Sequence, residues 1–188
     1  MKKVIIIGAT GSLASVVVKE LEQQKDVALT LFVRNKNRIL NTQNVHIIEG
    51  DATNYNAIKS AIAGQDIVYI NLAGDLETMT NNIVKAMQEN KVKRVIAISS
   101  IGIYDKPLKS ILKPYRALAD ILEASGLDYT IIRPDWFTNG NEVDYHITVK
   151  PEPETGGALS RKSIAAFVAS IIENPENYIQ QNVGISKV

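Results

Sequence analysis

The sequence predicts an α/β fold of the Rossmann type, a doubly wound parallel sheet in one domain that spans residues 1–188. Three observations predict it: short β-branched runs alternate with helix-length stretches, turn signals separate these segments, and a glycine turn follows the first run. Such alternation is typical of βαβ units, in which helices cover both faces of a parallel sheet. A chain of 188 residues is also long enough to bury a sizeable core.

Six strand-like runs are short and rich in β-branched residues: Val4–Ile7, Leu29–Val33, Val45–Ile48, Ile67–Leu72, Val95–Ser99 and Tyr129–Arg133. Helices are predicted between or after them, at about 12–24, 55–63, 77–90, 114–125 and 161–173. Thr53 or Asn54 can cap the second helix, and Ser160 can cap the last.

Residues 134–159 follow a different pattern, rich in Pro, Gly, Asn and Glu and without a sustained helical period. They are predicted to form an irregular segment on the substrate side, with a short strand around Tyr145–Val149. Long irregular segments of this kind usually carry function.

Composition excludes several classes of function. The formal net charge is +1, from 21 basic and 20 acidic residues, so no field strong enough for nonspecific nucleic-acid or membrane binding is expected. The chain has no cysteine, which excludes disulfides and thiol chemistry. No secretory signal or membrane-length apolar run is present, so we expect a cytoplasmic protein. His146, with dispersed carboxylates nearby, is weak support for a metal site, and none is predicted.

The glycine turn Gly8-Ala9-Thr10-Gly11-Ser12-Leu13-Ala14 is the most informative stretch. A turn between a buried strand and a helix leaves several N–H groups directed at one point, at the positive end of the helix dipole. Gly8 permits the tight turn, Gly11 lets a pyrophosphate approach the backbone, and Ala14 lets the helix pack on the strand. This stretch therefore predicts a dinucleotide site.

The residues that follow the second and third strands indicate which dinucleotide binds. Arg34 occupies the position where an acidic residue would favour NAD, and Asn35 and Arg38 follow it. Because a guanidinium matches phosphate oxygens, Arg34 favours NADP(H), although a solvated basic loop is the alternative. Asp51, beside Ala52, can accept a hydrogen bond from the adenine amino group, or it can form an Asx turn, and the two roles can coexist.

Small and hydroxyl residues follow the fourth and fifth strands. Ala73 and Gly74 let a ligand lie close to the backbone, and the hydroxyls of Ser99 and Ser100 can face the nicotinamide or the substrate. Ordinary turns have similar composition, so these residues can equally be structural. Trp136 and Phe137, after the sixth strand, can form an aromatic wall for a flat acceptor, with core packing as the alternative.

Together these residues resemble the atypical short-chain dehydrogenase/reductases of the NAD(P)-binding, NmrA-like kind, close to biliverdin-reductase-B-like and NADH-flavin-reductase-like proteins. The resemblance covers nearly the whole chain. Its marks are Gly8-Ala9-Thr10-Gly11, Val33-Arg34, Gly50-Asp51, Ser99-Ser100, the string from Ser125 to Pro134, and Ile164–Phe167 after Ser160-Arg161.

The resemblance implies a Rossmann sheet with a small C-terminal substrate region, and NADP(H) as the cofactor. It places the pyrophosphate at Gly8, Thr10, Gly11, Ser12 and Leu13, and the 2′-phosphate at Arg34. It places the adenine at Asp51 and Ala52 and the adenosine ribose near Ala73 and Gly74. Asn35 and Arg38, which follow Arg34, are further candidate cofactor contacts from the sequence itself. Ser99 and Pro134 are further candidate cofactor contacts.

The sequence departs from the wider superfamily at the catalytic pair Tyr-x-x-x-Lys, in which lysine lowers the pKa of the tyrosine acid. Tyr115 is followed four residues later by Ala119, and alignment on the Ser125–Pro134 string puts Tyr115 at the lysine position instead. Neither register contains the pair. Ser99, Ser100 and Tyr115 remain the catalytic candidates, and Tyr104, Trp136 and Phe137 the candidate substrate contacts.

These expectations favour an NADPH-dependent oxidoreductase that transfers a hydride to a flavin, a quinone or a similar small planar acceptor. Such a transfer needs little from the protein, because cofactor and acceptor carry the chemistry. The missing pair makes a non-catalytic NAD(P)H-binding redox sensor the alternative. A sugar-nucleotide epimerase is less favoured, because the C-terminal region is small for a nucleotide-sugar domain.

Overall fold

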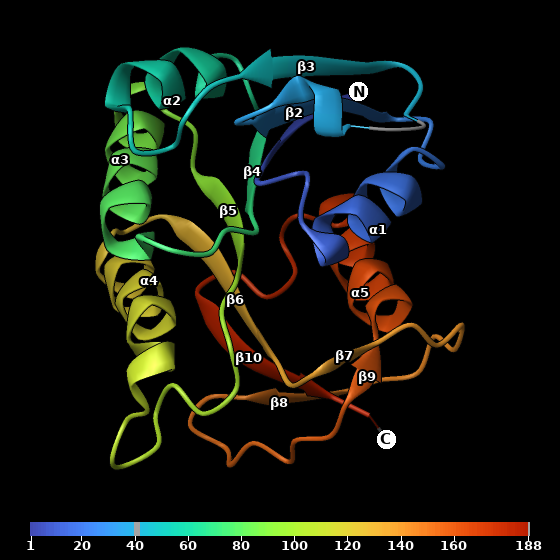
Figure 1. Ribbon diagram of the computed structural model, residues 1–188, viewed down its shortest axis with the longest axis vertical. Helices are drawn as coiled ribbons and strands as arrows, with labels where there is room; N and C mark the ends of the chain where they lie inside the picture. Colours follow the sequence, from blue (N-terminus) through green and yellow to red (C-terminus); the bar gives the residue numbers. More distant parts are fainter. Residues whose placement is uncertain (40–41, 188) are drawn as a thin grey trace.

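The computed structural model describes residues 1–39 and 42–187. Its centre is an eight-stranded sheet in the order β3-β2-β1-β4-β5-β6-β10-β8, shown in Figure 1. The strands are β1 (Lys2–Ile7), β2 (Val27–Val33), β3 (Val45–Glu49), β4 (Ile67–Ile70), β5 (Arg94–Ile98), β6 (Asp128–Pro134), β8 (His146–Val149) and β10 (Gln181–Ser186). All neighbouring pairs are parallel except β8 with β10. The predicted Rossmann-type α/β fold is confirmed.

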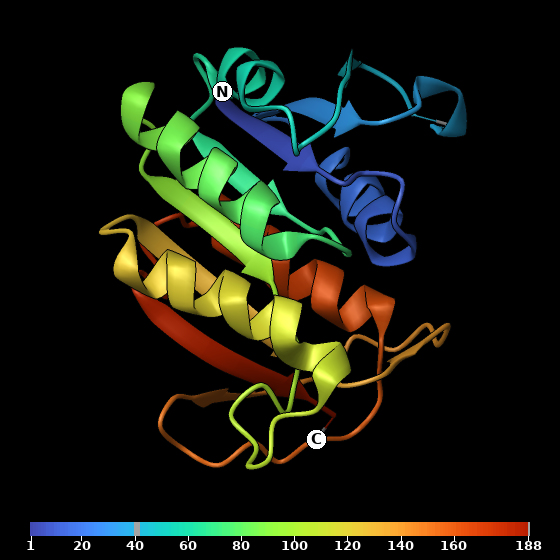
Figure 2. The same ribbon diagram turned by 60° about the vertical axis from the view of Figure 1, so that its left-hand side comes forward.

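Helices cover both faces of the sheet. One face carries α1 (Ser12–Leu21) and α5 (Arg161–Glu173), and the other carries α2 (Tyr55–Ile62), α3 (Leu76–Glu89) and α4 (Lys113–Ala124). Figure 2 shows α3 and α4 side by side in front of the strands. Two short 3₁₀ turns, η1 (Lys36–Arg38) and η2 (Ser110–Leu112), and a small parallel pair, β7 (Phe137–Thr138) with β9 (Leu159–Ser160), complete the fold. No helix of the described residues combines the length and apolarity needed to cross a membrane.

Alternation along β1 builds the two cores. Val4 and Ile6 pack toward α1 and α5, whereas Ile5 and Ile7 pack toward the opposite helices, and all four side chains are fully buried. Successive strand residues point to opposite faces, so a central strand covered on both sides is continuously apolar. This is why the sequence shows an unbroken Val-Ile-Ile-Ile run there.

The six predicted strands occur within one or two residues of their expected ends, and two predicted caps are present. The Asn54 side chain accepts from the Ala57 amide at 3.2 Å, and the Ser160 hydroxyl accepts from the Ser163 amide at 3.0 Å. Within residues 134–159 lie β7, the predicted short strand as β8, and the first residue of β9.

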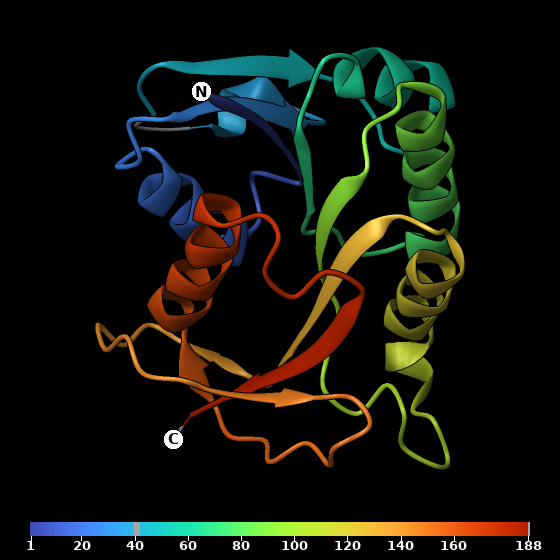
Figure 3. The ribbon, with the colours of Figure 1, turned by 180° about the vertical axis from the view of Figure 1, so that it is seen from behind.

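Strand β10 was not expected, yet Figure 3 shows it beside β6. Its sequence, Gln-Asn-Val-Gly-Ile-Ser, carries polar residues at positions that the fold buries, Asn182 and Ser186 among them. Only partners from distant segments satisfy these groups, so no local pattern indicates a strand.

Strand β1 pairs with β2 on one side and with β4 on the other. The order of the strands therefore reverses direction at β1. In doubly wound sheets this reversal opens a crevice at the carboxyl ends of the strands, where ligands bind. The fold therefore places the glycine turn at the centre of that crevice.

Candidate functional site

A cavity of about 1080 Å³ occupies this crevice. Its wall is built from the residues that directly follow β1, β2, β3, β4, β5 and β6, joined by η2, α4 and the first residue of α5. Predicted cofactor and acceptor residues on the wall are Gly8, Thr10, Gly11, Ser12, Leu13, Arg34, Asp51, Ala52, Ala73, Gly74, Ser99, Ser100, Tyr115, Pro134, Trp136 and Phe137. The structure thus brings together residues from both halves of the sheet.

Gly8 fixes the geometry of the turn after β1. Its φ of 93° lies in the left-handed region, and a Cβ there would lie 2.2 Å from the carbonyl oxygen of Asn71. Only glycine allows β1 and β4 to approach so closely at their carboxyl ends. The turn is closed by the Gly11 amide, which donates to the Gly8 carbonyl at 3.1 Å.

The N-terminus of α1 lacks a side-chain cap. Its N-cap is Gly11, and no acidic residue lies in its first turn. In contrast, Asn54, Asp75 and Ser160 cap the N-termini of α2, α3 and α5. Uncapped first-turn amides at the positive end of a helix dipole suit a phosphate. The residues present therefore fit the diphosphate of a dinucleotide.

Residues after β2 and β3 form one end of the cavity. Arg34 is exposed on the wall. Asp51 Oδ1 accepts from both the amide and the hydroxyl of Thr53 at 2.8 Å, and these bonds hold the pKa of Asp51 below its usual value. The Asx turn is therefore present, and Asp51 lies on the cavity wall as well.

Asn35 and Arg38, which the sequence places beside Arg34, do not line the cavity. Asn35 caps η1 by accepting from the Asn37 amide at 2.9 Å, and Arg38 is an exposed residue of that turn. The local capping bond holds the Asn35 side chain against its own turn.

The three catalytic candidates, Ser99, Ser100 and Tyr115, lie together at the other end of the cavity. Their hydroxyls differ in whether they already donate a hydrogen bond. Ser99 is 3% exposed and donates to the Tyr115 carbonyl at 3.0 Å, while Ser100 donates to the Ile101 carbonyl at 3.1 Å. Both serine protons are thus committed to main-chain oxygens. The Tyr115 hydroxyl has no hydrogen-bond partner among residues 1–39 and 42–187, so it alone of the three has an uncommitted proton.

An exposed apolar rim borders this end. Trp136 is 82% exposed, Ile111 77% and Phe137 36%, and all three line the cavity. Core packing of Trp136 is excluded by its exposure. Ile111 was not among the predicted substrate contacts, because an isolated isoleucine before a helix has no distinctive local pattern.

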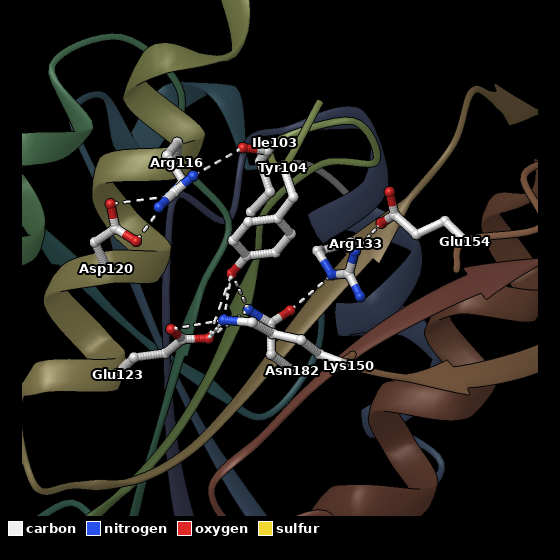
Figure 4. A network of polar contacts seen from close by, with 9 residues as sticks. All are labelled: Ile103, Tyr104, Arg116, Asp120, Glu123, Arg133, Lys150, Glu154 and Asn182. Atoms are coloured by element: carbon white, nitrogen blue, oxygen red, sulfur yellow. Dashed lines mark hydrogen bonds and ion pairs between the residues drawn. The ribbon is translucent and has the colours of Figure 1, made fainter. Parts of the chain in front are cut away.

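Tyr104, a candidate substrate contact from the sequence, does not line the cavity. Figure 4 shows its hydroxyl within a polar network, 2.7 Å from Asn182 Nδ2 and 3.3 Å from both Glu123 Oε1 and Lys150 Nζ. Burial raises the pKa of Tyr104 above its usual value. The network holds Tyr104 against α4 and β10 and away from the cavity.

The sequence also gave no role to Arg161, which lines the cavity from the start of α5. Its Nε donates to the Ser12 hydroxyl at 3.3 Å. The two residues are 149 positions apart, so only the tertiary fold reveals the contact.

Comparisons with known proteins agree with this geometry. A family model described as NAD(P)H-binding matches residues 8–175. The chain is 44% identical to a Rossmann-fold NAD(P)-binding family protein from Shigella flexneri, with a TM-score of 0.92 over 100% of this chain and 94% of that one. It is 25% identical to a short-chain dehydrogenase/reductase from Veillonella parvula solved in complex with NADP, with a TM-score of 0.89 over 99% of this chain and 94% of that one.

A curated relative is an isoflavone reductase homologue from Nicotiana tabacum, 26% identical over 154 residues, or 73% of this chain and 49% of that protein. The chain spans about half the length of the curated relatives it matches. The family model nevertheless covers most of the chain, including the glycine turn and every strand from β2 to β8. The chain therefore belongs to the NAD(P)H-binding family, and its resemblance to the atypical short-chain dehydrogenase/reductases is confirmed.

Proposed function

We propose that this protein is an NADPH-dependent reductase that transfers a hydride to a flat acceptor such as a flavin or a quinone. One observation carries the proposal: a single cavity joins the uncapped N-terminus of α1 to the apolar rim formed by Trp136, Ile111 and Phe137. When bound, the nicotinamide supplies the hydride.

Different residues along the cavity bind different parts of the dinucleotide. Arg34 offers a planar guanidinium to the 2′-phosphate, and the first turn of α1 offers its amides to the diphosphate. The complex of the Veillonella parvula relative with NADP supports the choice of NADP(H).

The apolar rim suits the acceptor. Trp136 and Ile111 expose large apolar surfaces at the cavity mouth, which a flat ring system can cover while water leaves. Tyr115 is the candidate proton donor, because it lines the cavity and its hydroxyl has no hydrogen-bond partner among residues 1–39 and 42–187. No lysine stands four residues after Tyr115, which favours acceptors that take their proton from solvent.

The second candidate function is a redox sensor that binds NADPH without turnover. The committed hydroxyls of Ser99 and Ser100 favour it, because they remove two potential donors. Steady-state NADPH oxidation with flavins, quinones and aldehydes separates the two functions. We expect turnover with flavins or quinones and little with aldehydes. Tight NADPH binding without turnover on any acceptor would instead support the sensor.

A variant tests the acceptor end. Trp136→Ala is expected to raise the KM for a quinone or flavin about 10-fold, since an aromatic contact contributes on the order of 1 kcal/mol beyond its buried area. The Kd for NADPH, measured by fluorescence titration, is expected to stay unchanged. Val143→Ala is the matched control, because Val143 is 60% exposed but does not line the cavity.

A further inference from the structure

Arg161 is a half-buried cation on the cavity wall, next to the glycine turn. Its Nε donates to Ser12 Oγ at 3.3 Å, and its Nη1 donates to the Thr138 carbonyl at 3.2 Å and to Asn139 Oδ1 at 2.8 Å. The guanidinium carbon lies 5.4 Å from the centre of the Phe137 ring. Ser12 is the first residue of α1, so the guanidinium lies beside the uncapped amides.

The charge of Arg161 is not compensated within the described part of the chain. All its hydrogen-bond partners are neutral, and no carboxylate of residues 1–39 and 42–187 lies within ion-pair distance. Nη2 donates to none of the described residues, which leaves donors of the guanidinium fork available.

The position of Arg161 in its own helix also disfavours a purely local role. It is the first residue of α5, whose first turn contains no acidic residue. A cation near a helix N-terminus is repelled by the helix dipole. Two positive helix ends and a guanidinium thus border the same part of the cavity, and an anion there would interact favourably with all three.

We propose that Arg161 binds the diphosphate of the dinucleotide together with the first turn of α1. The inference rests on the proposed function, because it requires the cavity to hold a dinucleotide. Arginine matches phosphate oxygens with two parallel hydrogen bonds, which are stronger than neutral ones. The 2′-phosphate and the diphosphate then each contact their own arginine, Arg34 at one end and Arg161 in the middle.

The surrounding structure orients Arg161 before any ligand arrives. Strands β7 and β9 pair Thr138 with Ser160, the residue before Arg161, and the Leu159 amide donates to the Trp136 carbonyl at 3.1 Å. Ser160 also caps α5. A guanidinium fixed in this way loses less conformational entropy when it binds a phosphate.

Isothermal titration calorimetry of the full chain with NADP⁺ tests the inference. Arg161→Gln is expected to raise the Kd for NADP⁺ about 10- to 100-fold, as expected for the loss of a hydrogen-bonded charge. Binding of 2′-AMP, which carries the 2′-phosphate but no diphosphate, is expected to stay within about 2-fold of wild type. Arg161→Lys, which keeps the charge without the planar fork, is expected to give an intermediate loss.

Lys162→Gln is the matched control, because Lys162 is exposed, bonds Asn141 at 2.7 Å and does not line the cavity. It is expected to bind NADP⁺ like wild type. Wild-type affinity of Arg161→Gln for NADP⁺ would overturn the inference and leave the proposed function intact. Equal losses for NADP⁺ and 2′-AMP would also overturn it, by showing a general structural effect. Failure of the wild-type chain to bind NADP⁺ would overturn the proposed function itself.

Discussion

Arg34 lies on the cavity wall directly after β2, where a carboxylate would be needed to accept from a ribose 2′-hydroxyl. It is exposed and forms no ion pair with the described residues, so its guanidinium is available to a ligand. The proposed preference for NADP(H) therefore depends on one side chain, placed by the end of one strand.

Arg34→Ala is expected to weaken NADPH binding about 10- to 100-fold, because a guanidinium–phosphate contact is lost, and to change NADH binding less than about 3-fold. Fluorescence titration of both coenzymes measures the Kd for NADPH and the Kd for NADH in the variant and in wild type. Arg38→Ala provides the control, since Arg38 is exposed in η1 and absent from the wall. Equal losses of NADPH and NADH affinity would show that Arg34 does not contact the 2′-phosphate.

At the scale of elements, the polar network in Figure 4 joins the C-terminal segments to the sheet. Arg133 of β6, 2% exposed, pairs with Glu154 and donates to Asn182 of β10 at 2.7 Å. Glu154 also accepts from the Gly102 amide, which is on the cavity wall, at 3.1 Å. Asn182 Nδ2 in turn donates to Glu123 Oε1 of α4 at 2.8 Å. The network therefore holds the irregular segment against the site.

Glu123 makes this network sensitive to acid. Burial by itself would raise the pKa of Glu123, but hydrogen bonds from Asn182 and Lys150 outweigh it and hold the pKa below the usual 4.5. A depressed folded-state pKa contributes stability that is present above pH 4.5 and is lost as the pH falls through the folded value.

Glu123→Gln is expected to lower the free energy of unfolding by about 1–3 kcal/mol at pH 7, through the loss of charge-assisted hydrogen bonds. Its unfolding free energy is then expected to fall less steeply than that of wild type below pH 4.5. Urea titrations between about pH 3 and pH 7 measure both effects. Glu173→Gln, at an exposed position, is the control. Parallel acid profiles for wild type and Glu123→Gln would contradict the role given to the network.

At the scale of the whole molecule, β10 completes the sheet. It lies between β6 and β8, and its Val183 and Ile185 are buried in the core that also contains α5. The last strand of the described chain therefore covers the edge of β6 and supports the helix that carries Arg161.

A chain that ends at residue 178 is expected not to fold cooperatively. Burial of Val183 and Ile185 contributes roughly 3–6 kcal/mol together, which is comparable to the whole stability of a domain, about 5–15 kcal/mol. Urea titration and near-ultraviolet circular dichroism measure the effect. The shortened chain is expected to show neither a sharp transition nor a near-ultraviolet signal. A chain ending at Ser186 keeps all of β10 and is expected to unfold cooperatively.

The sequence by itself determined strands β1 to β6 and the position of the glycine turn. Glycine at positive φ, β-branched runs and helix caps are local preferences, because each depends on a few neighbouring residues. Gly8, the Val4–Ile7 run and the caps Asn54 and Ser160 could therefore be predicted without a structure. The wall positions of Arg34 and Asp51 followed once the strand ends were placed.

Only the tertiary structure decided the rest, because those groups are satisfied by distant partners. Strand β10 contains polar residues whose partners lie on β6 and α4, so its local pattern does not indicate a strand. Tyr104 lies outside the cavity for the same reason, since its hydroxyl is hydrogen-bonded to Asn182 and Glu123. Arg161 reaches Ser12 across 149 positions. Long-range hydrogen bonds and uncompensated charges arise from folding itself, and local sequence patterns do not encode them.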